Sequence, residues 1–159
     1  MTPHAKIKEL LADVTSVPRR KYSGTERLEK LGISEERRIE IESMEFSRVG
    51  CEPTEGTPAC FKNIDLRDLH GVNRDDDVSD WIGLLFSLHK QYFFDRYRPE
   101  AFRNYLNACD ATTNDLPHVI ECGGKYYVHT NGKHRLTIAK CVGLQSAPAL
   151  VWSVPECVK

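Results

Sequence analysis

Two consecutive glycines, Gly123 and Gly124, stand between two stretches rich in β-forming residues, 116–121 and 126–129. Paired glycines supply the positive φ angles that a tight hairpin turn requires. No other pattern restricts the fold of this 159-residue chain as strongly, because it predicts two strands joined directly into a hairpin.

The second strand of this hairpin leads into another glycine turn, residues 130–133, and then into a predicted helix. Leu136, Ala139 and Val142 share one helical face, and Gly143 suits the C-terminal end of the helix. A further β-rich stretch follows at 147–152, so we expect the helix to cross over between neighbouring strands.

The turn before this helix is the candidate binding site. A helix N-terminus leaves amide N–H groups unpaired at the positive end of its dipole, and Gly132 lets an anion approach the backbone without a side chain in the way. Lys133, His134 and Arg135 add cationic or donor groups there, at some cost to the helix. This cost suggests an anionic partner, so the predicted phosphate-binding residues are Asn131, Gly132, Lys133, His134 and Arg135. The alternative is an ordinary helix start whose His134 and Arg135 pair with nearby acids.

The first 50 residues have helical patterns. The stripe at 7–14 predicts a short amphipathic helix, a second helix at 25–31 stops at Gly32, and Ser34 is placed to cap a third.

Two glycines, two prolines and two threonines lie between Val49 and Ala59 with little periodicity, which is the composition of a loop or linker. We expect a boundary there, between a helical N-terminal region at 1–50 and a phosphate-binding domain at 60–156. The apolar residues of 61–69 predict a strand that ends in a turn at His70-Gly71.

Three consecutive aspartates, residues 75–77, precede a stretch with helical spacing at 81–88. Neighbouring carboxylates point apart on a regular element and cannot all face one metal ion, whereas acids do suit a helix N-terminus. We therefore expect a solvated helix start. Aromatic residues and arginines alternate between Tyr92 and Tyr105, a composition that could contact nucleic acid but more often gives an amphipathic helix packed on a core.

Composition limits the function classes. Lys and Arg total 22 against 23 Asp and Glu, so nothing indicates bulk affinity for nucleic acid or an anionic membrane, and any basic site must be local. The start of the sequence lacks a signal-peptide pattern, and no apolar run approaches the ~18 residues of a membrane span. We expect a cytoplasmic protein without membrane contact.

Six cysteines occur without a C-x-x-C pair, so free thiols are expected and no metal site is assigned. A metal held by Cys51, Cys60 and His70 is the alternative.

Residues 117–152 resemble the ParB/sulfiredoxin-like superfamily. The matching features are Tyr127-Val128, Gly132-Lys133-His134-Arg135, Ala139, Gly143 and Pro148-Ala149-Leu150-Val151. Residues 64–69 and 81–88 look, more weakly, like the family's opening strand and the helix that follows it.

The resemblance implies an α+β fold, α/β-like, with a small mixed β-sheet and crossover helices after the helical N-terminal region. It also implies nucleotide binding at the glycine turn: CTP in partition clamps, ATP in sulfiredoxins, and ATP or ADP in free-serine kinases. The expected cofactors are therefore a nucleoside triphosphate, ATP or CTP, with Mg²⁺.

Departures from the family narrow the activity. Lys133 stands where sulfiredoxins have their cysteine nucleophile, which argues against sulfinate reduction. The helix-turn-helix reader of partition clamps has no counterpart before Lys159. Asn131 replaces an aspartate frequent in the kinases, so Glu121 or Asp65 would have to act as the base.

We expect an enzyme of phosphoryl transfer, or a hydrolase acting on a nucleotide or phosphodiester. His134 would act as donor or general acid, Arg135 as charge clamp and Glu121 as base. The alternative is a non-catalytic nucleotide- or DNA-binding module from a mobile element or phage, whose N-terminal helices bind a protein partner.

Overall fold

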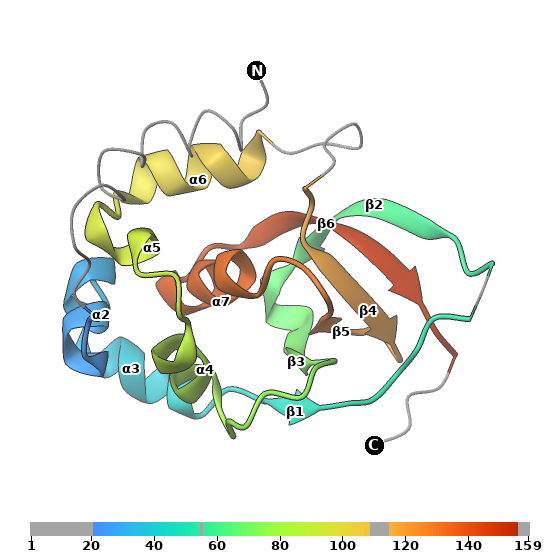
Figure 1. The fold of residues 1–159 in the computed structure, drawn as a ribbon, viewed down its shortest axis with the longest axis horizontal. Coiled ribbons are helices and arrows are strands. Elements are labelled where there is room, and N and C mark those ends of the chain that lie inside the picture. Colours follow the sequence, from blue (N-terminus) through green and yellow to red (C-terminus); the bar gives the residue numbers. More distant parts are fainter. Residues whose placement is uncertain (1–20, 55, 109–114, 156–159) are drawn as a thin grey trace.

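The computed structural model describes residues 21–54, 56–108 and 115–155, which form one six-stranded mixed sheet with helices packed against it (Figure 1). The strand order is β1-β3-β5-β4-β6-β2. The strands are β1 (Ser47–Arg48), β2 (Ala59–Asp65), β3 (Leu69–Val72), β4 (His118–Cys122), β5 (Lys125–Val128) and β6 (Ser146–Ser153). The expected mixed α/β architecture is confirmed at this level.

The predicted hairpin is present as β4 and β5, which pair antiparallel. Gly123 and Gly124 both have positive φ, 61° and 79°, as the turn requires. β4 also pairs parallel with β6 and therefore lies between β5 and β6. The expectation that the following helix crosses between neighbouring strands is consequently wrong, because the first strand of the hairpin occupies the place beside β5.

Helix α7 (Lys133–Val142) joins β5 to β6 and lies at the centre of the molecule, between the sheet and the other helices (Figure 1). Every residue from 134 to 141 is buried, and Gly143 ends the helix with a φ of 89°. Because the sheet covers one side of α7 and α4 (Trp81–Ser87) contacts another, even its polar residues are enclosed.

The N-terminal helices form as predicted, as α2 (Gly24–Leu31) and α3 (Glu35–Glu42). Ser23 and Ser34 accept capping hydrogen bonds, and Gly32 ends α2 in the left-handed conformation. The helix predicted at 7–14 lies outside the described residues.

Arg27 joins α2 to the rest of the fold. Its guanidinium is almost fully buried and donates hydrogen bonds to the carbonyl oxygens of Leu85 and Leu88, at 2.9 and 2.7 Å. It also lies 4.7 Å from the centroid of the Phe94 ring in α5 (Tyr92–Asp95). In addition, Leu28 and Leu31 of α2 and Ile41 of α3 belong to the same hydrophobic core as residues of α4, α7 and the sheet.

The turn expected at His70-Gly71 is displaced. The chain turns earlier, in the short 3-10 helix η1 (Leu66–Asp68), where the Asp65 carboxylate accepts from the backbone N–H of Arg67. Gly71 instead lies within β3, and a Cβ there would stand 1.7 Å from the carbonyl oxygen of Ser47 in β1. This glycine permits close strand pairing rather than a turn.

The aspartates at 75–77 do not start α4, which corrects the expected solvated helix start. Asp80 is the N-cap and accepts from the N–H of Gly83 at 2.6 Å. The aromatic and arginine stretch forms α5 and α6 (Pro99–Asn107), and the burial of Phe94, Phe102 and Tyr105 confirms core packing. Among the described helices, none combines the length and apolarity needed to span a membrane.

A smaller apolar cluster lies on the opposite face of the sheet from α7 and contains Val49, Cys51, Ile120 and Tyr127. Cys51 is disulfide-bonded, so the expectation of six free thiols is wrong at this position. Because its sulfur is bonded, Cys51 cannot supply a thiolate to the alternative metal site with Cys60 and His70.

Candidate functional site

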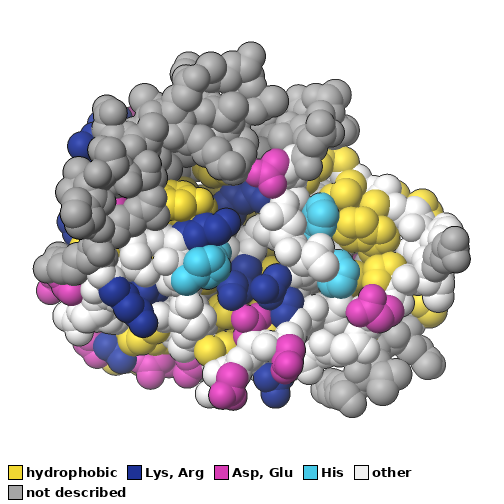
Figure 2. All heavy atoms as spheres, in the orientation of Figure 1, with side chains coloured by type: hydrophobic (Ala, Val, Ile, Leu, Met, Phe, Trp, Pro, Cys, Tyr) yellow, Lys and Arg dark blue, Asp and Glu magenta, His cyan; other side chains and the backbone are white. Residues whose placement is uncertain are grey.

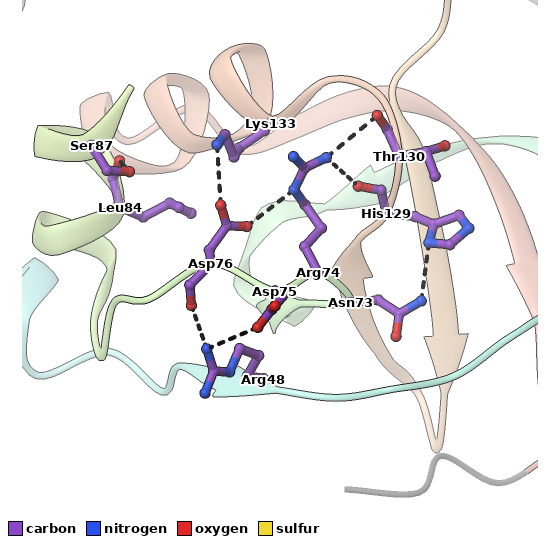
Figure 3. Close-up of polar contacts among 10 residues, drawn as sticks. All are labelled: Arg48, Asn73, Arg74, Asp75, Asp76, Leu84, Ser87, His129, Thr130 and Lys133. Atoms are coloured by element: carbon purple, nitrogen blue, oxygen red, sulfur yellow. Dashed lines mark hydrogen bonds and ion pairs between the residues drawn. The ribbon is translucent and has the colours of Figure 1, made fainter. Parts of the chain in front are cut away.

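The start of α7 lies at the edge of the sheet where β3 and β5 end. These strands are parallel, so their carboxyl ends meet there, and the amino end of β4 joins them because β4 runs antiparallel to β5. The residues that follow β3 and β5 thereby surround the predicted phosphate-binding turn, at the type of edge where α/β proteins commonly bind ligands (Figure 3).

The backbone of the turn retains open donors. Gly132 has a φ of 90°, and its carbonyl oxygen accepts the first helical hydrogen bond, from the N–H of Leu136 at 2.9 Å. Among the hydrogen bonds of the described residues, none is donated by the amides of Lys133, His134 or Arg135. These three N–H groups stand at the positive end of the helix dipole.

Gly132 itself has a different role from the expected one. A Cβ at this position would stand 2.5 Å from the Cβ of Pro117, so proline fills the space that the missing side chain leaves. The glycine allows the turn to pack closely on the residue before β4, and an anion cannot approach from that side.

An internal carboxylate already binds the cations at this edge. Asp76 accepts from the Nζ of Lys133 at 3.1 Å and from the Nε of Arg74 at 3.0 Å, and both acid and lysine side chains are about 85% buried (Figure 3). Arg74 also donates to the carbonyl oxygens of His129 and Thr130, at 3.0 and 3.4 Å. Lys133 therefore lies where the sequence predicts a phosphate ligand, with Arg74 beside it.

His134 points into the protein. Its Nε2 accepts from the N–H of Lys90 at 3.2 Å, and its ring stacks on Phe93 and meets His89 edge-on. Burial, followed by the nearby His89 and Lys90, lowers the pKa of His134 to about 3. The imidazole is therefore neutral at neutral pH and packs between elements, which does not suit the expected general acid.

Arg135 and Asn131 hold the segment before β4. Arg135 is 4% exposed and donates to the carbonyl oxygen of Asp115 at 2.6 Å, with its other nitrogen 3.6 Å from the Asp115 carboxylate. The Asn131 amide donates to the same carboxylate and to the carbonyl oxygen of Leu116, both at 2.9 Å. Both side chains thus position protein backbone.

The two expected bases lie away from the turn. Glu121 is three residues along β4 from His118, about 10 Å at the usual rise per residue, and accepts from the hydroxyl of Ser153 at 2.9 Å. Asp65 lies at the end of β2, where the Arg67 guanidinium lowers the pKa of this carboxyl to about 2. Neither carboxylate is brought to Lys133.

The structure instead brings two histidines to this edge. His118 and His129 lie opposite each other, the N–H of His129 donating to the carbonyl oxygen of His118 at 2.8 Å. Both rings meet Trp152 edge-on, with centroid distances of 5.1 and 6.1 Å. The pair had a signal in the sequence, because each histidine stands five residues from the nearer glycine of the hairpin turn.

In each imidazole, the Nδ1 atom has a hydrogen-bond partner within the protein. The Nδ1 of His118 lies 2.9 Å from the hydroxyl oxygen of Thr130, and the Nδ1 of His129 lies 3.0 Å from the amide nitrogen of Asn73. Burial lowers the pKa of His118, and the nearby His129 and Arg135 lower it further, while Asp115 opposes them.

On the face of the molecule in Figure 2, Lys and Arg side chains gather near the centre, and histidine side chains border them on both sides. This local concentration of basic groups is what a chain with a formal net charge of −1 requires for an anion site.

A separate hollow of about 510 Å³ lies between α3, η1 and the end of α7, and Arg37, Glu45, His70 and Lys140 are among its lining residues. It contains none of the predicted phosphate-binding residues. Within the described ranges, no group of three or more His, Cys, Asp or Glu side chains could hold a metal ion.

The resemblance to the ParB/sulfiredoxin-like superfamily rests on sequence motifs alone. In comparisons with known proteins, no family model, no curated protein and no solved structure matches this chain.

Proposed function

We propose that this protein binds the phosphate groups of a nucleotide or nucleic acid at the start of α7, and that it acts on them by phosphoryl transfer or hydrolysis. One observation carries the proposal. The Asp76 carboxylate is held by Arg74 and by Lys133, the first residue of α7, and the first three amide N–H groups of that helix have no acceptor among the described residues.

A carboxylate bound in this way marks the position as favourable for an anion. A phosphate carries more charge and more acceptor oxygens than a carboxylate, so we propose that it binds both cations at the positive end of the α7 dipole. Asp76 lies in the loop between β3 and α4 rather than in a helix or strand, so it can move aside when a ligand enters.

The Mg²⁺ that the resemblance implies does not fit the described residues. Mg²⁺ is usually held by one or two carboxylates together with substrate phosphates. Both oxygens of Asp76 are paired with cations, and Asp75 is fully exposed and 3.8 Å from Arg48. In the proposal Arg74 and Lys133 neutralise the phosphate, and no step depends on a metal.

Thermal unfolding in the presence of ATP, CTP, ADP and short RNA or DNA oligonucleotides tests the proposal. A ligand at about 100 times its Kd stabilises by roughly 2.7 kcal/mol, or about 5–10 °C for a chain of this size. Lys133→Met should abolish the shift. Lys125→Met, which removes a half-exposed lysine paired with Glu45, should retain it. The absence of a shift with every ligand, or an equal shift in Lys133→Met, contradicts the proposal.

The second candidate is a non-catalytic binding module for a nucleotide or DNA. It is favoured by the internal contacts of His134, Arg135 and Glu121, which leave the predicted catalytic groups engaged with the protein itself. Binding that depends on Lys133 without turnover of any ligand would select this candidate.

A further inference from the structure

His118 and His129 have no part in phosphate binding at Lys133, although they lie at the same edge. Strand alternation places them on the face of the sheet opposite α7, because the neighbouring Val119 and Val128 belong to the main core. Both side chains are half-buried rather than enclosed. Two adjacent imidazoles with solvent access form a candidate acid–base site.

The tautomer of the neutral His129 ring follows from its neighbours. The amide oxygen of Asn73 accepts from the N–H of Cys51, and its amide nitrogen donates to the carbonyl oxygen of Cys51, both at 2.6 Å. This pairing fixes the orientation of Asn73, so its remaining N–H points at the Nδ1 of His129. That nitrogen accepts, and neutral His129 carries its proton on Nε2 as a donor.

His118 is suited to the opposite role. When its Nδ1–H donates to the hydroxyl oxygen of Thr130, its Nε2 carries a lone pair. The groups around it are His129 and Arg135, which favour the neutral ring, and Asp115, which opposes them. The edge therefore offers one acceptor, the Nε2 of His118, and one donor, the Nε2–H of His129.

The cations and the imidazoles lie on either side of one backbone segment, residues 129–130. Arg74 donates to the carbonyl oxygens of this segment, while the imidazole of His129 points away from Asp76 (Figure 3). A ligand that reaches both groups must extend beyond a single phosphate. A polynucleotide strand, with consecutive phosphates, satisfies this condition.

We propose that this edge cleaves single-stranded RNA, with the 2′-hydroxyl as the nucleophile. This inference rests on the proposed phosphate binding. The 2′-oxygen attacks the adjacent phosphorus and its proton passes to the Nε2 of His118. The bond from phosphorus to the 5′-oxygen breaks, and the leaving oxygen takes a proton from water. The products are a 2′,3′-cyclic phosphate and a 5′-hydroxyl end, and His118 returns its proton to solvent.

The other residues of the edge stabilise charge in this step. The Nε2–H of His129 donates to a non-bridging phosphoryl oxygen, and Lys133 and Arg74 hold the neighbouring phosphate. RNA supplies its own nucleophile, which DNA lacks, and the reaction requires no metal-bound water.

The test uses a mixed-sequence single-stranded RNA in the presence of EDTA, with products identified by mass spectrometry. Wild-type protein should release cyclic-phosphate ends and should leave DNA and fully 2′-O-methylated RNA of the same sequence intact. His118→Ala and His118→Gln should each lower the cleavage rate by at least about 100-fold, the range expected for loss of a general base. His129→Ala should lower it by about 100- to 1,000-fold.

His70→Gln is the matched control, since His70 is a partly buried histidine of β3 that pairs with Glu45. Its cleavage rate should equal that of the wild type. Cleavage of DNA at the RNA rate, a requirement for Mg²⁺, or full activity in both His118 variants would overturn the inference.

Binding of the 2′-O-methylated RNA, measured by fluorescence anisotropy, separates this inference from the proposed function. The His118 variants should bind it within about threefold of the wild-type affinity, whereas Lys133→Met should not bind. If binding depends on Lys133 but RNA is never cleaved, the inference fails and the proposed phosphate site stands. If no binding occurs, both fail.

Discussion

The Cβ of Pro117 lies 2.5 Å from the point where a Cβ on Gly132 would stand, so α7 begins in direct contact with the residue that leads into β4. Gly132→Ala must both adopt a φ near 90° and displace this proline. We expect a loss of about 2–4 kcal/mol in unfolding free energy, measured by urea denaturation.

Gly143→Ala is the control for this prediction, because Gly143 has nearly the same φ, 89°, but a Cβ there meets only the Arg37 side chain at an ordinary 3.5 Å. It should cost about 1–2 kcal/mol. Equal losses in the two variants would mean that contact with Pro117 contributes nothing.

Asp76→Asn should strengthen phosphate binding, because the internal carboxylate competes with the ligand for Lys133 and Arg74. We expect about tenfold tighter binding of the 2′-O-methylated RNA by fluorescence anisotropy, equivalent to about 1.4 kcal/mol. Asp77→Asn removes the same charge from the exposed neighbouring residue and should change the Kd less than twofold. Weaker binding in Asp76→Asn would assign the carboxylate to the ligand site itself.

His134 should make the free energy of unfolding depend on pH. Its pKa is about 3 in the folded protein and about 6.5 when unfolded, so the folded state disfavours the imidazolium. The unfolding free energy therefore falls as the pH drops from 6.5 towards 3, by about 3 kcal/mol at pH 4.5.

His134→Gln isolates this effect, because an amide oxygen can still accept from the N–H of Lys90 but does not titrate. Urea denaturation at pH 7 and pH 4.5 should show a smaller loss in the variant than in the wild type. His118, with its lowered pKa, contributes in the same direction in both proteins. An identical loss in the two proteins would contradict the prediction.

The disulfide of Cys51 should contribute about 2–4 kcal/mol, so a reductant should lower the Tm by about 4–15 °C. Cys51→Ala should melt near the reduced wild type and should not respond to reductant. Cys122→Ala, which removes a free thiol, should keep the wild-type response. Disulfides persist mainly in oxidising compartments, so this measurement also bears on the cytoplasmic location proposed from the sequence.

Local signals predicted the hairpin, α7 and the two capped helices well, because glycine conformation, capping and helical spacing act within a few residues. The position of β6 beside β4 depends on pairing between distant segments, and no local pattern specifies it. The same limit applies to the site. The turn at Gly132 was predicted, whereas its partners Arg74 and Asp76 come from about 55 residues earlier in the chain.

The residue types at the turn also did not indicate where each side chain points. His134, Lys133 and Arg135 are consecutive, and successive helical side chains diverge by about 100°. His134 therefore packs on Phe93, Lys133 reaches Asp76 and Arg135 donates to Asp115. A cluster in sequence became three separate contacts in space.

The buried guanidinium of Arg27 makes α2 inseparable from the centre of the molecule. Its charge is stabilised by the carbonyl groups at the end of α4. Unfolding of α2 would therefore leave both the guanidinium and these carbonyl oxygens without their hydrogen-bond partners. Amide hydrogens of α2 should therefore exchange with solvent at rates close to those of α4, as parts of one cooperative unit, although α2 lies near the start of the described chain.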